Sequence, residues 1–538
     1  MSNNSAEQFD AVIIGAGISG LYQLLKLRQQ GMKVKVFETG DGVGGTWYWN
    51  RYPGARFDSE SYSYAYSFSE ELLDEWDWGE HFAGQPETLR YLNHVADKFD
   101  LRKDIQFNSK IKSAIYNDTT GRWLVEAEDG SQADGQFLIT AIGPLSAFTM
   151  PNIPGIDDFK GESWHTARWP HEPISFEGKR IGVIGTGATG VQTIQEVAKT
   201  AKHLTVFQRR PNWCAPLNNG KITAAEQPDL KKRYPEIFKT CLETTGCFLH
   251  APTMTSAHDA TPEEREALYE KLYAERGFGI WVGAYYDTLM DETANQYLTD
   301  FIANKIRGRV KDPETAKNLI PVDHGFGTRR VPLETKYYEV YNQDNVRLVN
   351  VKDDPIETIT AKGVKTIAEE HELDMLFYAT GFDGITGAFD RIDIRGVNGV
   401  KLKDKWDEEV KTYLGMQIVG FPNMFTLVGP QNTATLCNIP RCIEQNVEWV
   451  SDTIQYMRDN KLNKIEPKDQ FQEKWTKELI EMASMSMFMK VPSWISGQNS
   501  NVAGKDKPRY IVYMGGAPMY REVCDQEANS GYEGFNLA

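Results

Sequence analysis

Two stretches of the chain share one pattern, in which a run of apolar residues leads directly into closely spaced glycines and then into an amphipathic segment. The first stretch begins at Phe9 and continues to Leu27, and the second begins at Lys179 and continues to about Thr200. A short apolar run that opens into glycines is typical of a buried parallel strand that turns sharply into a helix. The pattern therefore predicts two βαβ units.

Further apolar runs predict the strands that complete these units, and they cover residues 33–38, 135–143, 203–208, 371–381 and 424–428. Residues 220–328 are instead charged with helical periodicity, and Pro262 directly after Thr261 is typical of a first helical turn behind a cap. A long helix is predicted from about Pro440 to Asn460. We therefore expect an α/β fold with two Rossmann-like dinucleotide-binding domains and a helical insertion.

The overall charge of the chain narrows its partners. Among 538 residues, 59 are Lys or Arg and 75 are Asp or Glu, so the net charge is −16. A protein that binds nucleic acid needs a basic surface that replaces counterions, and this composition argues against nucleic acid as a partner. No apolar stretch approaches the ~20 residues of a membrane span, so we expect no membrane association.

The cysteines and the N-terminus indicate where the protein works. The six cysteines include no C-x-x-C pair and no zinc-site spacing, which predicts free thiols, no metal site and a reducing cytoplasm. A secretory signal has a basic region followed by an apolar one, and the N-terminus shows no such pattern.

The first glycine-rich turn has the features of a dinucleotide site. Gly15 permits a tight turn, Gly17 allows a pyrophosphate to approach the backbone, and Gly20 allows the helix to pack on the strand. The next strand ends at Glu38, which is 38 − 20 = 18 residues after Gly20, where a carboxylate accepts hydrogen bonds from ribose hydroxyls. A lone glycine motif has many structural uses, but this combination favours a nucleotide with a free ribose.

The second turn has the opposite charge preference. Its motif is Gly185-Thr186-Gly187-x-x-Gly190, and the strand that follows leads into Arg209 and Arg210. A cation at this place pairs with the 2′-phosphate of NADP, which a carboxylate would repel. A solvated basic corner is the less favoured alternative for the two arginines. Together, the two folds suggest a flavin held near a nicotinamide.

Between the two folds lies Phe159-x-Gly161-x-x-x-His165-x-x-x-Trp169-Pro170. By itself this spacing is more often a matter of packing than of chemistry. With its flanking glycine motifs, however, it resembles the fingerprint of the type I Baeyer–Villiger monooxygenases. The resemblance extends over nearly the whole chain and includes the segments 44–47, 50–58, 85–87, 327–330, 379–383, 421–425 and 428–430.

The resemblance implies that FAD, NADPH and O2 convert a ketone, most readily a cyclic one, into an ester or lactone, through a C4a-peroxyflavin that attacks the carbonyl. Sulfides are implied as side substrates. A ketone and O2 are then the only expected partners of a monomer or weak homo-oligomer. Negative charge on the reacting oxygens needs a fixed cation in a water-poor site, and arginine keeps its charge there.

The resemblance also assigns roles to individual residues. Arg330 falls where the family has its active-site arginine, and Asp58 falls where a carboxylate positions it; a surface ion pair is the simpler interpretation of either alone. Arg329 replaces the family's usual lysine for NADP, and Trp494 matches the tryptophan of a mobile lid that closes over NADP, so both are expected NADP contacts. The remaining expected contacts are Gly45, Thr46, Trp47 and Asp58 for FAD, and Ala434, Thr435 and Leu436 for the substrate.

Two parts of the pattern leave room for alternatives. His165 and Trp169 fit linker packing and the coupling of domain motion about equally, with direct catalysis less favoured. The lid differs from the family's G-A-N-x-P-G-K, because Gly497 to Lys505 is two residues longer and lacks the proline.

The expected domains follow from these assignments. They are the first part of the FAD domain at 1–141, the linker and first part of the NADP domain at 142–220, the insertion at 221–328, the second part of the NADP domain at 329–384, and the second part of the FAD domain at 385–538.

Three other functions stay open. One is a related flavin monooxygenase that acts on nitrogen or sulfur nucleophiles, against which Pro170, Asp58 and Arg330 argue. The second is an FAD- and NADPH-dependent disulfide reductase, which needs a redox cysteine pair that we do not expect here. The third is a nucleotide-binding sensor without activity, which the two charged residues make less favoured.

Overall fold

The computed structural model describes residues 6–538, except for the side chains of Glu408, Ala434 and Thr435. Within this part of the chain, no helix is both long enough and apolar enough to cross a membrane.

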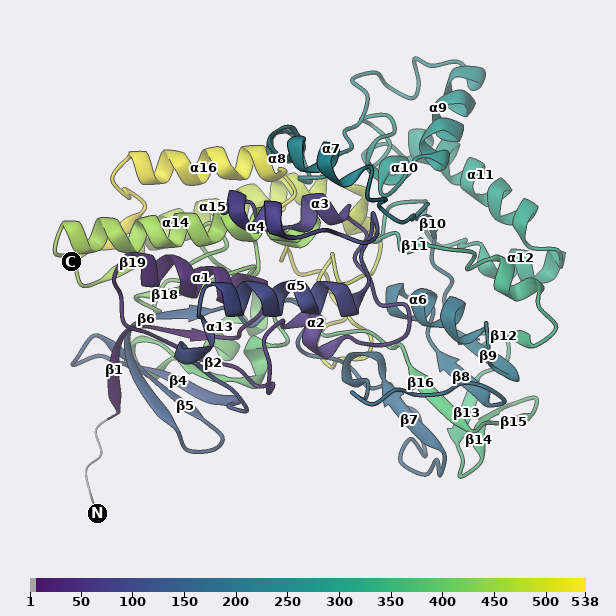
Figure 1. Cartoon of the computed structure of the whole chain (residues 1–538), viewed down its shortest axis with the longest axis horizontal. Coiled ribbons are helices and arrows are strands. Elements are labelled where there is room, and N and C mark those ends of the chain that lie inside the picture. Colours follow the sequence, from purple (N-terminus) through teal and green to yellow (C-terminus); the bar gives the residue numbers. More distant parts are fainter. Residues whose placement is uncertain (1–5) are drawn as a thin grey trace.

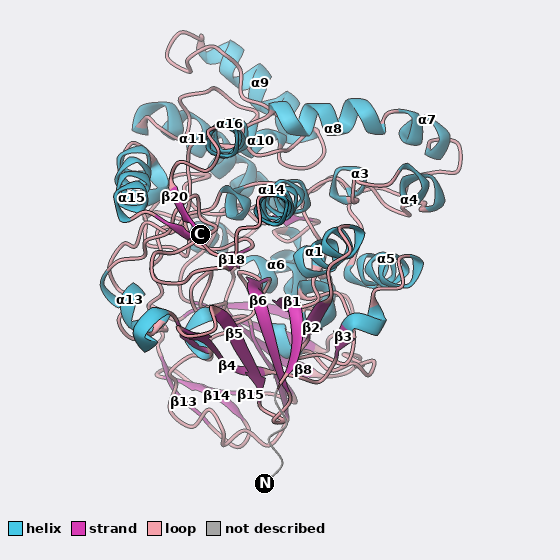
Figure 2. Cartoon of the chain, turned by 90° about the vertical axis from the view of Figure 1, so that its left-hand side faces the viewer, coloured by secondary structure: helices cyan, strands magenta, loops and turns pink. Residues whose placement is uncertain are grey.

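The first of two large sheets is built mainly from the N-terminal part of the chain (Figure 2). Its strands run in the order β17-β4-β5-β6-β1-β2-β3, and β18 pairs with β6. Their bounds are β1 Glu7–Ile14, β2 Val34–Phe37, β3 Ile105–Gln106, β4 Ile111–Asn117, β5 Arg122–Ala127, β6 Gln132–Thr140, β17 Asp393–Arg395 and β18 Met424–Thr426. Strands from after residue 390 thus complete a sheet that begins at residue 7.

The predicted strand, turn and helix at the N-terminus are confirmed. β1 lies between β2 and β6, parallel to both, and residues 11–14 are buried as an inner strand of a parallel sheet requires. Helix α1 (Ile18–Gln29) follows at once and packs against α14 (Ile439–Asp459), where Gln23 Nε2 donates to Ser451 Oγ over 2.8 Å. The long helix that the sequence predicts from about Pro440 is this α14.

The second sheet is entirely parallel, with the strand order β12-β9-β8-β16-β7. It lies at the lower right of Figure 1, next to the small antiparallel sheet β13-β14-β15. The bounds are β7 Glu162–His165, β8 Arg180–Ile184, β9 His203–Gln208, β12 Val346–Asn350, β13 Ile356–Ile359, β14 Gly363–Thr366, β15 Glu370–Glu372 and β16 Met375–Tyr378. Helix α6 (Ala188–Val197) follows β8, as the second glycine motif predicts.

Helices interrupt this second unit between β9 and β12, as expected, and they lie at the top centre and upper right of Figure 1. They are α7 Gln227–Lys232, α8 Tyr234–Glu243, α9 Pro262–Ala274, α10 Gly279–Val282, α11 Glu292–Arg309 and α12 Pro313–Leu319. Helix α9 begins at Pro262 behind a capping box, in which Thr261 and Glu264 bind each other's backbone N–H groups. The α/β class with two Rossmann-like units and a helical insertion is confirmed.

The remaining elements surround the two sheets. They are α2 Thr46–Trp49, α3 Ser61–Tyr64, α4 Glu70–Glu75, α5 Gln85–Lys98, β10 Ala215–Pro216, β11 Leu333–Glu334, α13 Leu402–Glu408, β19 Ile465–Pro467, α15 Asp469–Ser484, α16 Ala517–Asn529 and β20 Phe535–Leu537. Helix α8 of the insertion contacts both α3 and α16, so the insertion rests on the first unit as well as on the second.

Candidate functional site

The first glycine-rich turn is so tight that side chains are excluded from it. A Cβ atom at Gly15 would lie 2.5 Å from the Ala141 carbonyl oxygen, and one at Gly20 would lie 1.9 Å from the Gly15 carbonyl oxygen. Gly45 approaches the same turn, because its Cβ would lie 2.8 Å from Gly17 Cα. The structure thus brings together the four glycines that the sequence assigns to FAD.

Glu38 stands beside this turn with its carboxylate already oriented. Its Oε2 accepts a hydrogen bond from Ala16 N over 2.7 Å, and its Oε1 accepts one from Gly40 N over 2.8 Å. Burial raises the pKa of Glu38, and the backbone N–H groups of Gly40 and Ala16 oppose that rise. Each carboxylate oxygen keeps a further lone pair for a ribose hydroxyl.

The two other predicted FAD residues at this turn lie in different surroundings. Thr46 is exposed at the start of α2, beside Gly45. Trp47 is buried instead, and its Nε1 donates to Tyr64 Oη over 3.1 Å. The Trp47 indole is therefore part of the core under the turn, which supports the turn from behind.

The second turn repeats this geometry but leaves open space at its centre. A Cβ atom at Gly185 would lie 2.4 Å from the Ala379 carbonyl oxygen, and one at Gly190 would lie 2.2 Å from the Gly185 carbonyl oxygen. At Gly187 a Cβ atom would meet no atom of the described structure within 4 Å. The open side of Gly187 faces away from the protein at the N-terminus of α6, where a pyrophosphate fits.

The three arginines predicted for NADP gather beside this turn. Arg210 Nε lies 3.9 Å from Asp323 Oδ2, and Thr186 Oγ1 donates to the Arg210 carbonyl oxygen over 3.0 Å. Burial lowers the pKa of Arg329; Asp323 counteracts this, and the positive charges of Arg210 and Arg209 lower it further. Mutual repulsion of this kind favours an added anion.

One hydrogen-bond donor in this cluster is left over. Arg329 Nε is buried and has no hydrogen-bond partner within the described part of the chain. A 2′-phosphate supplies both the charge and the acceptors that the cluster needs, so the residues fit NADPH. Asp323, which no sequence motif marked, partly balances the arginines.

Arg330 and Asp58 form an ion pair although 272 residues separate them. Arg330 Nη2 donates to Asp58 Oδ2 over 2.5 Å, and the Asp58 side chain is 1% exposed while that of Arg330 is 31% exposed. Burial raises the pKa of Asp58, and the Arg330 guanidinium opposes that rise. Nη1 of Arg330 is buried without a partner among the described residues. This N–H group is free to bind an oxygen of a cofactor or substrate.

The fingerprint lies on a strand and a 3-10 helix, at the edge of the second sheet. His165 ends β7, the 3-10 helix Thr166–Arg168 follows, and the His165 ring centroid lies 4.8 Å from that of Phe148 and 6.1 Å from that of Phe382. Burial, together with the nearby Arg168 charge, lowers the pKa of His165 to about 4. A histidine that is neutral and packed between aromatic rings suits the packing and coupling interpretations better than acid–base catalysis.

The other fingerprint residues pack along the same sheet. Trp169 lies against Phe377 of β16, with ring centroids 4.8 Å apart, and Pro170 directly follows it. Phe159 packs against a small apolar cluster behind β16, and a Cβ atom at Gly161 would lie 2.5 Å from the Asp374 carbonyl oxygen.

The predicted substrate residues belong to the 3-10 helix Thr433–Leu436, just before α14. The side chains of Ala434 and Thr435 lie outside the described part of the structure. Leu436 is partly buried against an apolar cluster to which Trp494 also packs. The structure thus brings the substrate segment and the predicted lid tryptophan to the same cluster.

The lid loop, which we define as residues 491–512, lies between the 3-10 helix Met487–Lys490 and α16. Arg329 Nη2 donates to the Pro492 carbonyl oxygen over 2.5 Å, which connects the lid loop with the arginine cluster. At Gly384 a Cβ atom would lie 3.7 Å from the Cβ atom of Trp494, so the lid loop also approaches the segment after β16.

The cysteines differ from expectation. Cys437 and Cys442 form a disulfide across four intervening residues, so the prediction that all six thiols are free is wrong. Cys247 Sγ lies 3.8 Å from Cys442 Sγ, and the thiols of Cys214, Cys241, Cys247 and Cys524 are free and buried. The spacing C-x-x-x-x-C was the signal in the sequence that could have revealed the pair.

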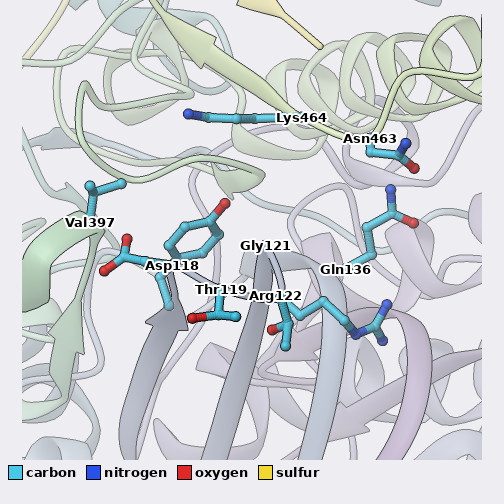
Figure 3. Close-up of a pocket in the computed structure, with 10 residues that line it drawn as sticks. Asp118, Thr119, Gly121, Arg122, Gln136, Val397, Asn463 and Lys464 are labelled. Carbon is cyan, nitrogen blue, oxygen red and sulfur yellow. The ribbon is translucent and has the colours of Figure 1, made fainter.

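A surface hollow lies at another part of the molecule (Figure 3). The turn between β4 and β5 lines it together with Val397, Asn463 and Lys464. It contains none of the residues predicted for the cofactors, the substrate or catalysis. The glycine turns and the Arg330–Asp58 pair therefore define the candidate site.

Known proteins resemble this chain over its full length. A family model described as flavin-binding monooxygenase-like matches residues 9–226. The chain is 46% identical to the 2-oxo-Delta(3)-4,5,5-trimethylcyclopentenylacetyl-CoA monooxygenase of Pseudomonas putida, over 100% of both chains. It is 42% identical to a Baeyer–Villiger monooxygenase of Pseudooceanicola batsensis, over 97% of this chain and 95% of that one.

The relatives differ in the substrates for which they are named. An acetone monooxygenase of Gordonia is 44% identical over 99% of this chain and 100% of its own. A phenazine N-monooxygenase of Lysobacter antibioticus is 40% identical over 100% of this chain and 98% of its own. The crystal structure of OTEMO in complex with FAD and NADP matches with a TM-score of 0.95 at 47% identity, over 98% of this chain and 99% of that one.

Proposed function

This chain belongs to the Baeyer–Villiger monooxygenases of the flavin-binding monooxygenase-like group, and on that premise we propose that it converts a ketone into an ester or lactone. The net reaction consumes the ketone, O2, NADPH and a proton, and it yields the ester, NADP⁺ and water. The pairing of Arg330 with the buried Asp58 is the observation that carries the proposal.

FAD and NADPH are the two cofactors, and each has a set of residues that fits it. Bound FAD, once NADPH has reduced it, activates O2 for insertion of one oxygen atom next to the carbonyl carbon. We propose that the first glycine turn, Gly45, Thr46 and the Glu38 carboxylate hold FAD, while Trp47 supports the turn from the core. Glu38 selects the free ribose hydroxyls, since a carboxylate repels a ribose phosphate.

NADPH is held at the second turn, with its pyrophosphate against Gly187 and its 2′-phosphate among Arg209, Arg210 and Arg329. The buried, unpartnered Arg329 Nε supports this placement among the described residues. Because Arg329 also binds the Pro492 carbonyl oxygen, the same side chain connects the nucleotide site with the lid loop and Trp494.

Arg330 supplies a fixed positive charge where negative charge develops on oxygen during the reaction. Its guanidinium keeps its charge even in a water-poor site, because its intrinsic pKa exceeds ~12. Asp58 holds one guanidinium nitrogen in place through Nη2, which leaves Nη1 to bind oxygen. Asp58 is thus a positioning residue, and preorganisation of this kind contributes strongly to catalysis.

We propose cyclic ketones as the principal substrates, because the relative with 46% identity is named for a cyclopentenyl compound. The acetone monooxygenase relative makes acyclic ketones a necessary part of any test. Leu436 lines the substrate side, since it packs on the cluster that also receives Trp494. Ala434 and Thr435 stay predictions for the same role.

Oxygenation of a ring nitrogen is a second candidate, which the phenazine N-monooxygenase relative favours. It uses the same cofactor sites but needs no arginine to stabilise an oxyanion on the substrate. The five domain segments given above, the cytoplasmic location and the monomeric or weakly oligomeric state stay predictions.

A direct test follows NADPH oxidation and product mass for cyclic ketones, acetone, an aryl methyl sulfide and phenazine. We expect a gain of one oxygen as a lactone from cyclic ketones. Oxygen gain by phenazine alone would establish the second candidate instead. Hydrogen peroxide as the only product from every compound would contradict both.

A further inference from the structure

One lysine of the lid loop is buried between two carboxylates. Lys505 Nζ lies 2.6 Å from Asp383 Oδ1 and 3.1 Å from Asp390 Oδ2, and it donates to Thr386 Oγ1 over 3.1 Å. The Lys505 side chain is 9% exposed, and that of Asp383 is 11% exposed. Most other ion pairs of the described chain join side chains that are far more exposed, so water screens this contact less than it screens those pairs.

We propose that Lys505 is a positioning residue that latches the lid loop onto the segment after β16. The closed lid loop keeps water out of the site, so that less oxygen is lost as hydrogen peroxide. This role rests on the proposed function, because it concerns how closely NADPH oxidation is coupled to oxygenation. The latch would fix the place at which the lid loop closes.

The energetics of such a cluster suit a latch that opens. Burying an ammonium and two carboxylates costs hydration energy, which largely offsets their attraction. When the lid loop moves away, all three groups regain water. The contact therefore adds little to the stability of the closed form but specifies its geometry, because a lid loop closed in any other position would leave the ammonium buried and unpaired.

The lid loop has further bonds to the same segment. Asn499 Nδ2 donates to the Phe382 carbonyl oxygen over 2.9 Å, and Asn501 Nδ2 donates to the Thr380 carbonyl oxygen over 3.3 Å. Phe382 also contacts the ring of His165. The latched segment is thus the one on which the fingerprint histidine packs.

Both ends of the lid loop are consequently tied to parts of the NADP site. Near its start, Pro492 binds Arg329 of the arginine cluster. Near its end, Lys505 binds Asp383, which follows closely after Ala379, the residue against which the second glycine turn packs. The lid loop can therefore be held at both places only when the second glycine turn and the arginine cluster have the arrangement seen in this structure.

The unusual length of this lid loop also serves the latch. Asn499 N donates to the Lys505 carbonyl oxygen over 2.7 Å, and Val502 N donates to the Asn499 carbonyl oxygen over 3.0 Å. Residues 499–505 therefore close into a compact turn, which includes the two extra residues and directs Lys505 inward. The chain departs from the family pattern here but keeps its lysine.

The test replaces Lys505 by Met, which has a similar length and no charge, and by Arg, which restores the charge. Lys507→Met is the matched control, because Lys507 is exposed in the same loop. For each protein we would measure FAD content, flavin reduction by NADPH, the ratio of hydrogen peroxide to ester, the Kd of NADP⁺, and amide hydrogen exchange in residues 491–512.

We expect Lys505→Met to keep its FAD and its reduction rate, to release about fivefold more hydrogen peroxide per ester, and to bind NADP⁺ about tenfold more weakly, since a buried charge pair is broken. Exchange in the lid loop should accelerate, Lys505→Arg should restore part of the coupling, and Lys507→Met should match the unmodified enzyme. Asp390→Asn, which keeps Asp383, should lie between.

Two results would separate the possible failures. If the unmodified enzyme forms no ester, the proposed function is wrong, while hydrogen exchange and NADP⁺ affinity still test the latch. If the enzyme forms ester and Lys505→Met shows unchanged coupling, NADP⁺ affinity and exchange, Lys505 is no latch. If Lys505→Met does not fold, Asp390→Asn serves as the test. Unchanged coupling, NADP⁺ affinity and hydrogen exchange in that variant would likewise overturn the proposal.

Discussion

The replacement Asp58→Asn tests how Arg330 is positioned. Asparagine has the same shape as aspartate, so the change removes the charge and keeps the packing around a side chain that is 1% exposed. Arg330 then loses its ionic acceptor at Nη2 and gains freedom to rotate. The guanidinium stays charged but is no longer held with Nη1 toward the reacting oxygen.

The size of the effect follows from the bond that is weakened. A hydrogen bond to a charged group contributes about 1.5–3 kcal/mol. If this energy serves to position Arg330 in the transition state, ester formation should fall about 10- to 150-fold, since each 1.36 kcal/mol corresponds to a factor of ten. Burial raises the pKa of Asp58, so its charged form is costly to bury and the neutral asparagine avoids that cost. The loss of unfolding free energy should therefore be smaller than the rise in activation free energy.

The assay compares ester formation, NADPH oxidation and thermal unfolding in Asp58→Asn and in Asp134→Asn. Asp134 also binds an arginine, Arg122, but on the first sheet between β5 and β6, and its side chain is 24% exposed. We expect the Asp134 variant to behave like the unmodified enzyme. Ester formation at an unchanged rate in Asp58→Asn would show that Asp58 does not position Arg330.

Two further predictions concern the nucleotide turn and the fingerprint. Gly187→Ala should fold and keep FAD, because the added methyl group meets no described protein atom within 4 Å. Its NADPH affinity, measured by titration, should fall at least about tenfold, because the methyl group occupies the space proposed for the pyrophosphate. A normal NADPH affinity would contradict this placement of the pyrophosphate. The pKa of His165 is about 4 in the folded protein and 6.5 in the unfolded chain, so the unfolded state binds more protons between pH 4 and 6.5. His165 therefore makes the free energy of unfolding rise with pH in this window, by up to about 3 kcal/mol, and adds no further rise above pH 6.5. His165→Asn should flatten this rise. Urea unfolding at pH 5 and pH 7 measures this, and an unchanged difference between the two pH values would contradict the buried, neutral state of His165.

Much of the fold was predictable because its signals are local. The strand, turn and helix around Gly15 and Gly185, the capping box at Thr261 and the long helix α14 all depend on residues that are near one another in the sequence. The charge at the end of a strand, negative at Glu38 and positive at Arg209, likewise distinguished the predicted FAD site from the predicted NADP site without any tertiary information.

Contacts between distant segments were not predictable in this way. Asp58 and Arg330 are 272 residues apart, and only the resemblance to a family paired them. Asp323 carries no motif, yet it balances the arginines of the NADP site. The latch between Lys505 and Asp383 joins two motifs whose proximity no periodicity encodes.

One error concerns the cysteines, and one site residue lies in surroundings that its motif does not encode. The disulfide between Cys437 and Cys442 was not predicted, because four residues separate the two cysteines and the C-x-x-C spacing of a typical redox pair does not describe them. Trp47 is buried and bonded to Tyr64, which only the folded structure shows, since an indole that can both bury its surface and satisfy its N–H is stable there; its contact with FAD stays a prediction.

The most direct measurement of the central claim compares Arg330→Ala with the unmodified enzyme during reduction by NADPH and during oxygenation of a cyclic ketone. Because Arg330 acts on the developing negative charge and not on hydride transfer, the variant should keep FAD and be reduced by NADPH at a rate within about threefold of normal, while ester formation falls by at least about a hundredfold, the loss typical of a removed oxyanion donor. The added variant Asp58→Asn/Arg330→Ala removes the buried, unpaired carboxylate and should fold at least as well. Ester formation at the normal rate in either variant would contradict the account.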